Sequence, residues 1–258
     1  MIVSIIQRDK NYFSRRLALD DLGPSRVTGL APIHFAICWP WALQQLIIAG
    51  ADINCEDKSG RRPIHLAVAC GPIEAVEILL QADCSIYTHS YFNSLLQEAK
   101  TRQQTDDYVV TLIVDALIDR HTRLINLAMP WLPDGSDLKK HLRQGIILEN
   151  RAPELLEALT THGYPVPRSL EVDNNSVYYG LHDTIYEPSL TVTLANKLWE
   201  DGFHCIDDFM PHNSLTPFLA SWYKGDFDMV SWFIERGRLL LPKTLQACIR
   251  AFICLRLP

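Results

Sequence analysis

The sequence lacks any apolar run long enough to span a bilayer. The longest such stretch, residues 109–118, is interrupted by Asp115 and followed by Asp119, whereas a spanning helix needs roughly 20 apolar residues. The first six residues are mostly apolar, but no basic region precedes them and charged residues follow at 8–10, so they do not form a secretion signal. We therefore expect a soluble protein of the cytoplasm or nucleus, with no membrane partner.

Positive charge and paired cysteines are also lacking. The 24 Lys and Arg are outnumbered by 30 Asp and Glu, which gives a net charge of −6, so we expect no direct binding of nucleic acid, which needs clustered Lys and Arg in excess. Seven cysteines are odd in number and include no C-x-x-C pair, which argues against both a closed disulfide set and a zinc site. No metal and no other cofactor is expected.

The common catalytic signatures are missing as well. The chain has no G-x-S-x-G, no G-x-x-x-x-G-K and no G-x-G-x-x-G, the patterns of serine hydrolases, P-loop enzymes and dinucleotide-binding enzymes. The densest group of acid–base or metal-ligating side chains is His204, Cys205, Asp207, Asp208 and His212. Its spacing matches no recognised metal signature, so an enzyme is kept only as an alternative, and we expect no catalytic residues.

What the sequence does contain is an internal repeat. Pro32-Ile33-His34-Phe35-Ala36 returns 31 residues later as Pro63-Ile64-His65-Leu66-Ala67. A helical stripe of apolar residues follows each copy, closing with Ala49-Gly50-Ala51-Asp52 after the first and with Asp83-Cys84 after the second. A third, weaker copy begins at Thr216-Pro217-Phe218, where Leu219 replaces the histidine and Gly225 follows. A period in this range indicates a stack of similar supersecondary units.

These residues resemble the ankyrin repeat, whose pattern is D-x-x-G-x-T-P-L-H-x-A, then G-h-x-E-V-V-x-L-L-L, then G-A-D-h-N. The second copy fills that pattern in order with Asp57, Gly60, Pro63, Ile64, His65, Ala67, Gly71, Glu74, Val76, Leu79 and Leu80. The resemblance implies an all-α, ankyrin-type α-solenoid of stacked helix pairs with short hairpin connections. A narrower similarity links the chain to divergent ankyrin-repeat proteins of filamentous fungi.

Several pattern residues have a mechanical role. Pro63 can open a helix because the first turn has unpaired N–H groups in any case, and Gly50 can end one in a left-handed conformation. We expect Gly71 to allow the turn between the two helices, and Asp83, in place of glycine, to give a looser end. His34 and His65 recur at the repeat period, so we interpret them as structural hydrogen-bonding groups rather than a catalytic or metal pair.

The central region is more degenerate. Residues 106–127 are predicted to form one long helix, with Asp115, Asp119 and Arg120 lying off its apolar stripe. Further helices ending at glycine are predicted over 153–159 and 194–199. The cluster 204–212 then falls where the family places a polar hairpin, and we interpret it as a loop.

The resemblance divides the chain into four parts: an N-terminal capping segment at 1–26, two clear repeats at 27–88, degenerate helical repeats including the long helix at 89–210, and a C-terminal repeat with an apolar final helix at 211–258. That final helix lacks the polar outer face that closes a solenoid. We expect it to end a truncated repeat, to fold back, or to dock on another chain, self-association included.

The family resemblance implies a non-catalytic scaffold that binds another protein through its concave surface. An alternative is a transcription co-regulator, for instance of a fungal metabolite gene cluster, acting through a DNA-binding partner. Partner contacts in the family use hairpin tips and the exposed ends of first helices. In the second repeat those places hold Lys58, Ser59, Arg61, Ala69 and Cys70. In the C-terminal repeat they hold His212, Asn213, Leu215, Tyr223 and Lys224.

Overall fold

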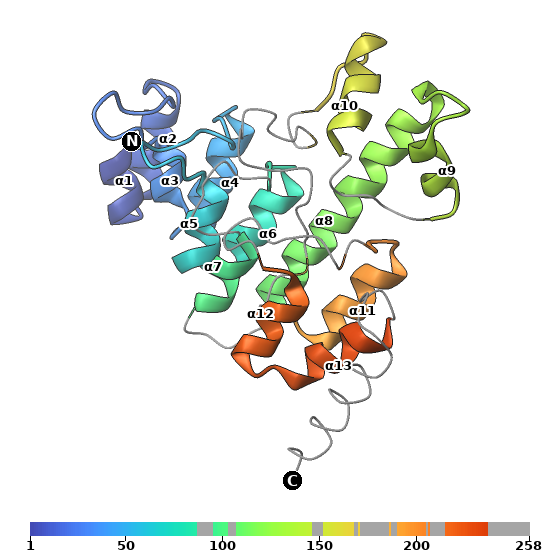
Figure 1. The fold of residues 1–258 in the computed structure, drawn as a ribbon. Helices are drawn as coiled ribbons and strands as arrows, with labels where there is room; N and C mark the ends of the chain where they lie inside the picture. Colours follow the sequence, from blue (N-terminus) through green and yellow to red (C-terminus); the bar gives the residue numbers. More distant parts are fainter. Residues whose placement is uncertain are drawn as a thin grey trace. The chain divides into compact units, whose positions relative to one another are not determined.

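The computed structural model shows a helical chain (Figure 1). It describes residues 1–86, 95–102, 107–145, 152–167, 170, 186, 190–204, 206 and 215–236. Within these ranges every regular element is a helix, and none of them is long and apolar enough to cross a membrane. The chain forms two compact units, Met1–His121 with 166–173, and Thr122–Pro165 with 174–258. The all-α fold predicted from the sequence is confirmed.

The first unit is a stack of helix pairs. The two repeats with the Pro-Ile-His motif form α3 (Pro32–Ala36) with α4 (Pro40–Ile48), and α5 (Pro63–Cys70) with α6 (Ile73–Gln81). Within each pair the helices pack together, α3 also packs on α5, and α4 packs on α6. First helices therefore stack on first helices and second helices on second helices, which is the arrangement of an α-solenoid.

The N-terminal segment holds a helix pair of its own. Helices α1 (Ile2–Gln7) and α2 (Lys10–Leu17) pack on α3 and α4 respectively, so they continue the two rows of helices seen in Figure 1. Phe13 is fully buried and contacts Trp39 and Trp41 edge to face, with ring centroids 5.7 and 5.5 Å apart. Trp39 is therefore a packing residue and does not project from the inter-helix turn.

The long central helix is observed as α8 (Asp107–Ala128), and it follows α7 (Leu95–Thr101), which packs on α5. Asp115 and Asp119 are exposed as predicted, but Arg120 is only 2% exposed. Its Nε lies 3.9 Å from a carboxylate oxygen of Asp83 at the end of α6. The prediction that Arg120 lies off the buried face was wrong, because Asp83 offers a buried guanidinium an acidic partner from another helix.

The second unit holds the remaining helices. The end of α8 continues into a 3-10 turn (Met129–Trp131), followed by α9 (Asp137–Arg143) and α10 (Ala152–Thr161), which packs on that turn. Helices α11 (Val192–Glu200), α12 (Pro217–Lys224) and α13 (Phe227–Glu235) follow, with α13 packed on both α11 and α12. The predicted helices at 153–159 and 194–199 thus correspond to α10 and α11, and the final helix predicted beyond residue 236 lies outside the described residues.

Two glycines of the repeat pattern serve different purposes. Gly50 has a φ of 86°, the left-handed conformation predicted for the end of a second helix. Gly71 instead has a φ of −80°, which any residue can adopt. A Cβ at Gly71 would lie 2.5 Å from Cγ2 of Ile37 and 2.9 Å from Cα of Ala67, so glycine is required there by close packing, not by turn geometry.

Substituting Gly29 tests how tightly the first two hairpins fit together. Gly29 and Gly60 both have a φ of 74°, but a Cβ would lie 2.7 Å from the Lys58 nitrogen at Gly29 and would meet nothing within 4 Å at Gly60. We expect Gly60→Ala to cost about 1 kcal/mol of unfolding free energy for its backbone conformation, and Gly29→Ala to cost clearly more because main chain must move. Urea unfolding of both variants measures this; equal losses would contradict the close approach.

Substituting Asp83 tests the pair with Arg120. Asp83 has a φ of 62°, so the family's glycine should relieve strain there. We nevertheless expect Asp83→Gly to lower the unfolding free energy by roughly 1–3 kcal/mol, because buried Arg120 loses an acidic partner. In a double-mutant cycle with Arg120→Met, the loss caused by Asp83→Gly should shrink or reverse. An Asp83→Gly variant more stable than the wild type would show that backbone strain outweighs the ion pair.

Candidate protein-binding surface

The hairpin between α4 and α5 is organised around the carboxylate of Asp57. Oδ1 of Asp57 accepts hydrogen bonds from the main-chain N–H groups of Ser59 (2.7 Å) and Arg61 (3.0 Å). Oδ2 accepts from Nε and Nη2 of Arg61, at 3.1 and 3.0 Å. Burial disfavours ionisation, but these hydrogen bonds outweigh it and hold the pKa of Asp57 below its usual value. One buried carboxylate thus fixes the shape of the tip.

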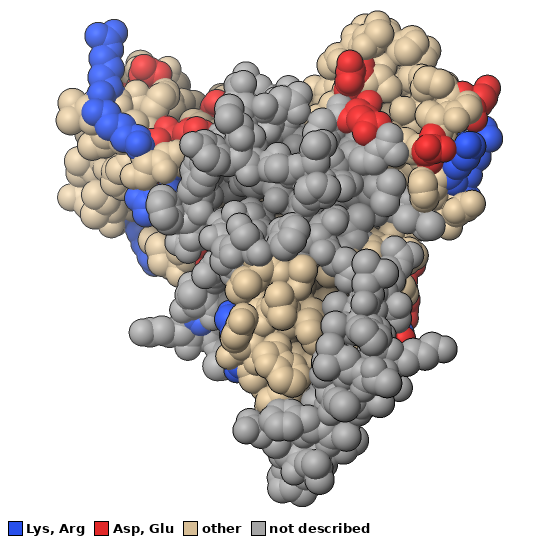
Figure 2. Space-filling view, in the orientation of Figure 1, with Lys and Arg blue, Asp and Glu red and all other residues tan. Residues whose placement is uncertain are grey.

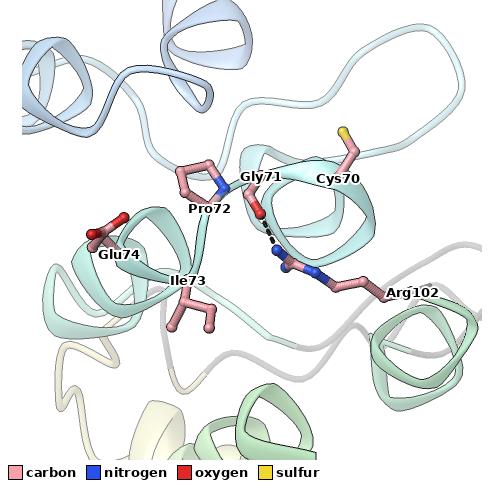
Figure 3. Close-up of a pocket in the computed structure, with 6 residues that line it drawn as sticks. All are labelled: Cys70, Gly71, Pro72, Ile73, Glu74 and Arg102. Atoms are coloured by element: carbon pink, nitrogen blue, oxygen red, sulfur yellow. Dashed lines mark hydrogen bonds between the residues drawn. The ribbon is translucent and has the colours of Figure 1, made fainter. Parts of the chain in front are cut away.

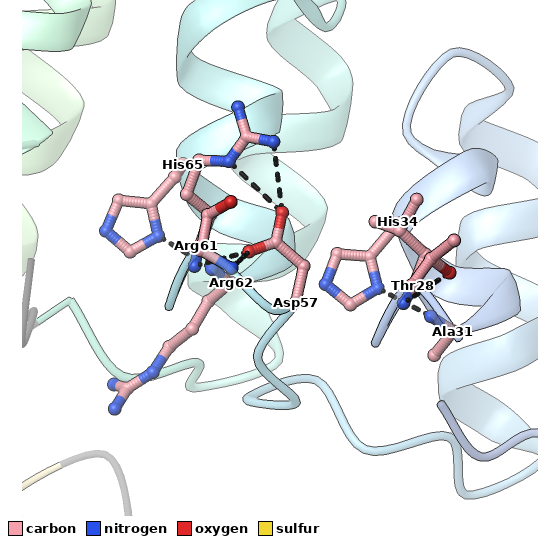
Figure 4. A network of polar contacts seen from close by, with 9 residues as sticks. Thr28, Ala31, His34, Asp57, Arg61, Arg62 and His65 are labelled. Atoms are coloured by element: carbon pink, nitrogen blue, oxygen red, sulfur yellow. Dashed lines mark hydrogen bonds and ion pairs between the residues drawn. The ribbon is translucent and has the colours of Figure 1, made fainter. Parts of the chain in front are cut away.

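This hairpin is joined to the hairpin that precedes α3. The Lys58 N–H donates to the carbonyl oxygen of Thr28 at 3.3 Å, and Figure 4 shows the side chain of His34 lying between Thr28 and the Asp57 hairpin. Because Gly29 has no Cβ, the two backbones can approach at this point. The two tips are therefore held at a fixed spacing.

The two recurring histidines are buried parts of the scaffold. Nδ1 of His34 accepts the N–H of Ala31 (3.0 Å), and Nδ1 of His65 accepts the N–H of Arg62 (2.9 Å). Each histidine is the third residue of its helix, and its ring accepts a hydrogen bond from the residue that precedes the helix. The acidic residue of a capping box makes the same contact. Burial lowers the pKa of both rings, that of His65 to about 4 with help from the Arg62 charge. The structural interpretation of these histidines is confirmed.

The five residues predicted to contact a partner in the second repeat are all exposed: Lys58, Ser59, Arg61, Ala69 and Cys70. The positive charge of the hairpin tip is smaller than its Lys and Arg residues suggest, however, because two of them are paired. Arg61 is held by Asp57, and Arg62 forms an ion pair with Glu56 at 2.9 Å. Reversing the charge of Arg61 would therefore disturb the hairpin itself, which makes Lys58 the better probe of binding.

A groove at the far end of α5 was not predicted from the sequence. It encloses about 510 Å³ and is lined by residues 70–74 and Arg102, as Figure 3 shows. Arg102 donates to the carbonyl oxygens of Gly71 (2.5 Å), Val68 (3.4 Å) and Ala67 (3.5 Å). A guanidinium placed there satisfies the last carbonyls of α5 and offsets the negative end of its dipole. Arg102 lies in a weakly patterned segment, so nothing in the sequence signalled this role.

The corresponding surface of the C-terminal unit is partly described. Tyr223 is 74% exposed, Lys224 is exposed and Leu215 is half-buried, whereas His212 and Asn213 lie outside the described residues. Leu219, which replaces the repeat histidine, is 39% exposed, and Thr216 takes over the helix cap by accepting the Leu219 N–H at 3.4 Å. In Figure 2 the described surface over α12 carries little charge.

The cluster considered as an enzyme site is represented by His204. Its ring lies against Trp199, with centroids 4.2 Å apart, and its Nε2 is 3.1 Å from the Trp199 carbonyl oxygen, so it donates to the end of α11. The other members of that cluster lie outside the described residues. Among the residues that the structure describes, no group of three or more His, Cys, Asp or Glu could hold a metal ion.

Comparison with known proteins agrees with this geometry. Residues 46–99 match the family model for ankyrin repeats present in many copies. This segment is similar to ankyrin repeats. The neurogenic locus Notch protein of Drosophila melanogaster is 41% identical over 56 residues, which are 21% of this chain and 2% of that protein. Neurogenic locus notch homolog protein 4 of Homo sapiens is 40% identical over 57 residues, 21% of this chain and 3% of that protein.

The chain therefore spans only a few per cent of the length of these curated relatives. The similarity supports ankyrin repeats, which are protein–protein interaction modules and are generally non-catalytic. The similarity to fungal proteins stays a prediction from the sequence.

Replacing His65 with Gln tests the buried histidine through pH. The folded pKa of about 4 lies below the ordinary value of 6.5, so the unfolded chain binds a proton that the folded chain does not. Stability from neutral His65 is full above pH 6.5 and is lost as the pH falls towards 4, by roughly 3 kcal/mol. Gln can keep a hydrogen bond to the Arg62 N–H but does not titrate.

We expect the fall in unfolding free energy between pH 7 and 4 to be smaller in His65→Gln than in the wild type. It should not vanish, because the pKa values of His34 and His121 are also lowered by burial. Urea unfolding across this range measures the difference. Identical pH profiles would mean that the pKa of His65 is not lowered in the folded chain.

Proposed function

We propose that this chain is a scaffold that binds a partner protein through its hairpin tips and the exposed ends of its first helices. The observation that carries the proposal is that, within residues 46–99, the residues that build the repeat differ from the residues that are exposed. The repeat-defining His65 and Pro63 are buried and structural, while the neighbouring positions Lys58, Ser59, Arg61, Ala69 and Cys70 are exposed. Residues that neither pack nor cap are free to contact another molecule.

The proposed surface runs along α5 from the Asp57 hairpin to the groove at residues 70–74. The eight residues of α5 cover about 12 Å at 1.5 Å per residue. An extended peptide or one face of a helix could therefore contact both ends. Pro72 and Ile73 line the groove and are only half-buried. The proposed surface therefore has an apolar end at the groove and a polar end at the hairpin tip. Mixed polar and apolar lining is typical of surfaces that bind proteins.

In the C-terminal unit we assign the same role to Leu215, Tyr223 and Lys224, with His212 and Asn213 retained from the sequence. Leu219 and Tyr223 are one turn apart on α12 and both exposed, so they offer neighbouring apolar contacts. A role as a transcription co-regulator would be one use of such a surface. That role, a cytoplasmic or nuclear location, and self-association through the apolar C-terminal end stay predictions from the sequence.

Site-specific photo-crosslinking tests the proposed surface. A photoreactive phenylalanine analogue is placed at Lys58, Ala69 or Tyr223, and at Gln44 as a control, which is exposed on the second helix α4. In cells that express the chain naturally, we expect the first three positions to form adducts with a common protein and Gln44 to form none. Adducts of that protein from Gln44 but not from Lys58 or Ala69 would place the interface elsewhere.

A further inference from the structure

We infer that the two adjacent hairpin tips of the first unit bind an acidic segment of the partner protein. The residues concerned, here called the tip strip, are Arg26, Val27, Lys58, Ser59 and Arg61. The inference rests on the proposed function, since it names the chemistry of the partner at one end of the proposed surface.

The first argument is the balance of charge after internal pairing. The Asp57 carboxylate is buried and is occupied by four hydrogen bonds from within its own hairpin. Glu56 is paired with Arg62. Asp52, the third acidic residue of this hairpin, accepts the N–H of Asn54 at 2.9 Å. The two acidic groups next to the tip, Glu56 and Asp57, are thus compensated internally, and the exposed charge left at the tip is positive.

The second argument is the exposure of the remaining cations. Arg26 and Lys58 are exposed, and neither is in an ion pair within the described part of the chain. The Arg61 side chain is 48% exposed although it is bound to Asp57, so part of its guanidinium still faces solvent. In a chain with a net charge of −6, such a surplus of positive charge at one place favours an acidic ligand over others.

The third argument is that the strip is rigid. The hydrogen bond from Lys58 to Thr28 and the close approach at Gly29 hold the two tips together, while the Asp57 carboxylate fixes the backbone from 59 to 61. A backbone that is already ordered loses little freedom on binding. Val27, which is 76% exposed, follows Arg26 in the chain and offers an aliphatic contact next to a cation, which fits a polypeptide rather than a small anion.

Binding of short fluorescein-labelled peptides to the full chain, followed by anisotropy, tests the inference. The probes are a Glu/Ala peptide, Gln/Ala and Lys/Ala peptides of equal length, and a single-stranded oligonucleotide. We expect the Glu/Ala peptide to bind most tightly, and its affinity to fall as salt is raised, because exposed charges are screened. Arg26→Glu with Lys58→Glu should weaken that binding about fivefold per reversed charge.

The matched control reverses two exposed cations outside the strip, Arg15 on α2 and Lys140 on α9, which changes the net charge equally. Arg61 is left intact because it supports the hairpin, and thermal melting verifies that both double variants fold. Equal binding of the Glu/Ala and Gln/Ala peptides, equal loss in the control, or preference for the oligonucleotide would overturn the inference. If crosslinking at Lys58 and Ala69 still succeeds in that case, the proposed function stands and only the acidic character of the partner is wrong.

Discussion

The exposed surface of the first unit depends on one buried carboxylate. Asp57 accepts hydrogen bonds from two main-chain N–H groups and a guanidinium, and hydrogen bonds to a charged acceptor are the stronger ones. The contact from Lys58 to Thr28 follows from that shape, and so does the spacing of the two tips. Asp57 thus positions Ser59 and Arg61 directly and Lys58 through the hairpin, whereas Ala69 and Cys70 lie at the other end of α5.

The start of each first helix is likewise stabilised by one or two side chains. Proline removes one N–H that would otherwise be unpaired, and the histidine two positions later accepts the N–H of the residue before the proline. Since both side chains are then buried, they are unavailable to a partner. In the C-terminal unit Thr216 performs the cap instead, and the side chain at the histidine position, Leu219, becomes exposed. A change in how the helix is capped therefore changes what the surface offers.

Where the chain departs from its repeat pattern, other contacts compensate. Asp83 stands in a left-handed position that suits glycine, yet its carboxylate lies beside the buried Arg120 of α8. Arg102 similarly satisfies the end of α5 from outside the repeat. Both arginines come from the segment after the two clear repeats. Long-range partners of this kind are a reason why degenerate sequence can still belong to an ordered stack.

The sequence by itself determined the helical fold, the two clear repeats, the long central helix and the exposed positions of the second repeat. These follow from local rules: proline at a helix start, glycine at a helix end, and apolar spacing along one helical face. It did not determine that Arg120 is buried or that Arg102 caps α5. Nor did it determine that Gly71 is needed for close packing or that Arg61 is paired with Asp57. Each of these depends on which residue from a distant part of the chain lies within a few ångströms, and such proximity is decided only when the helices pack.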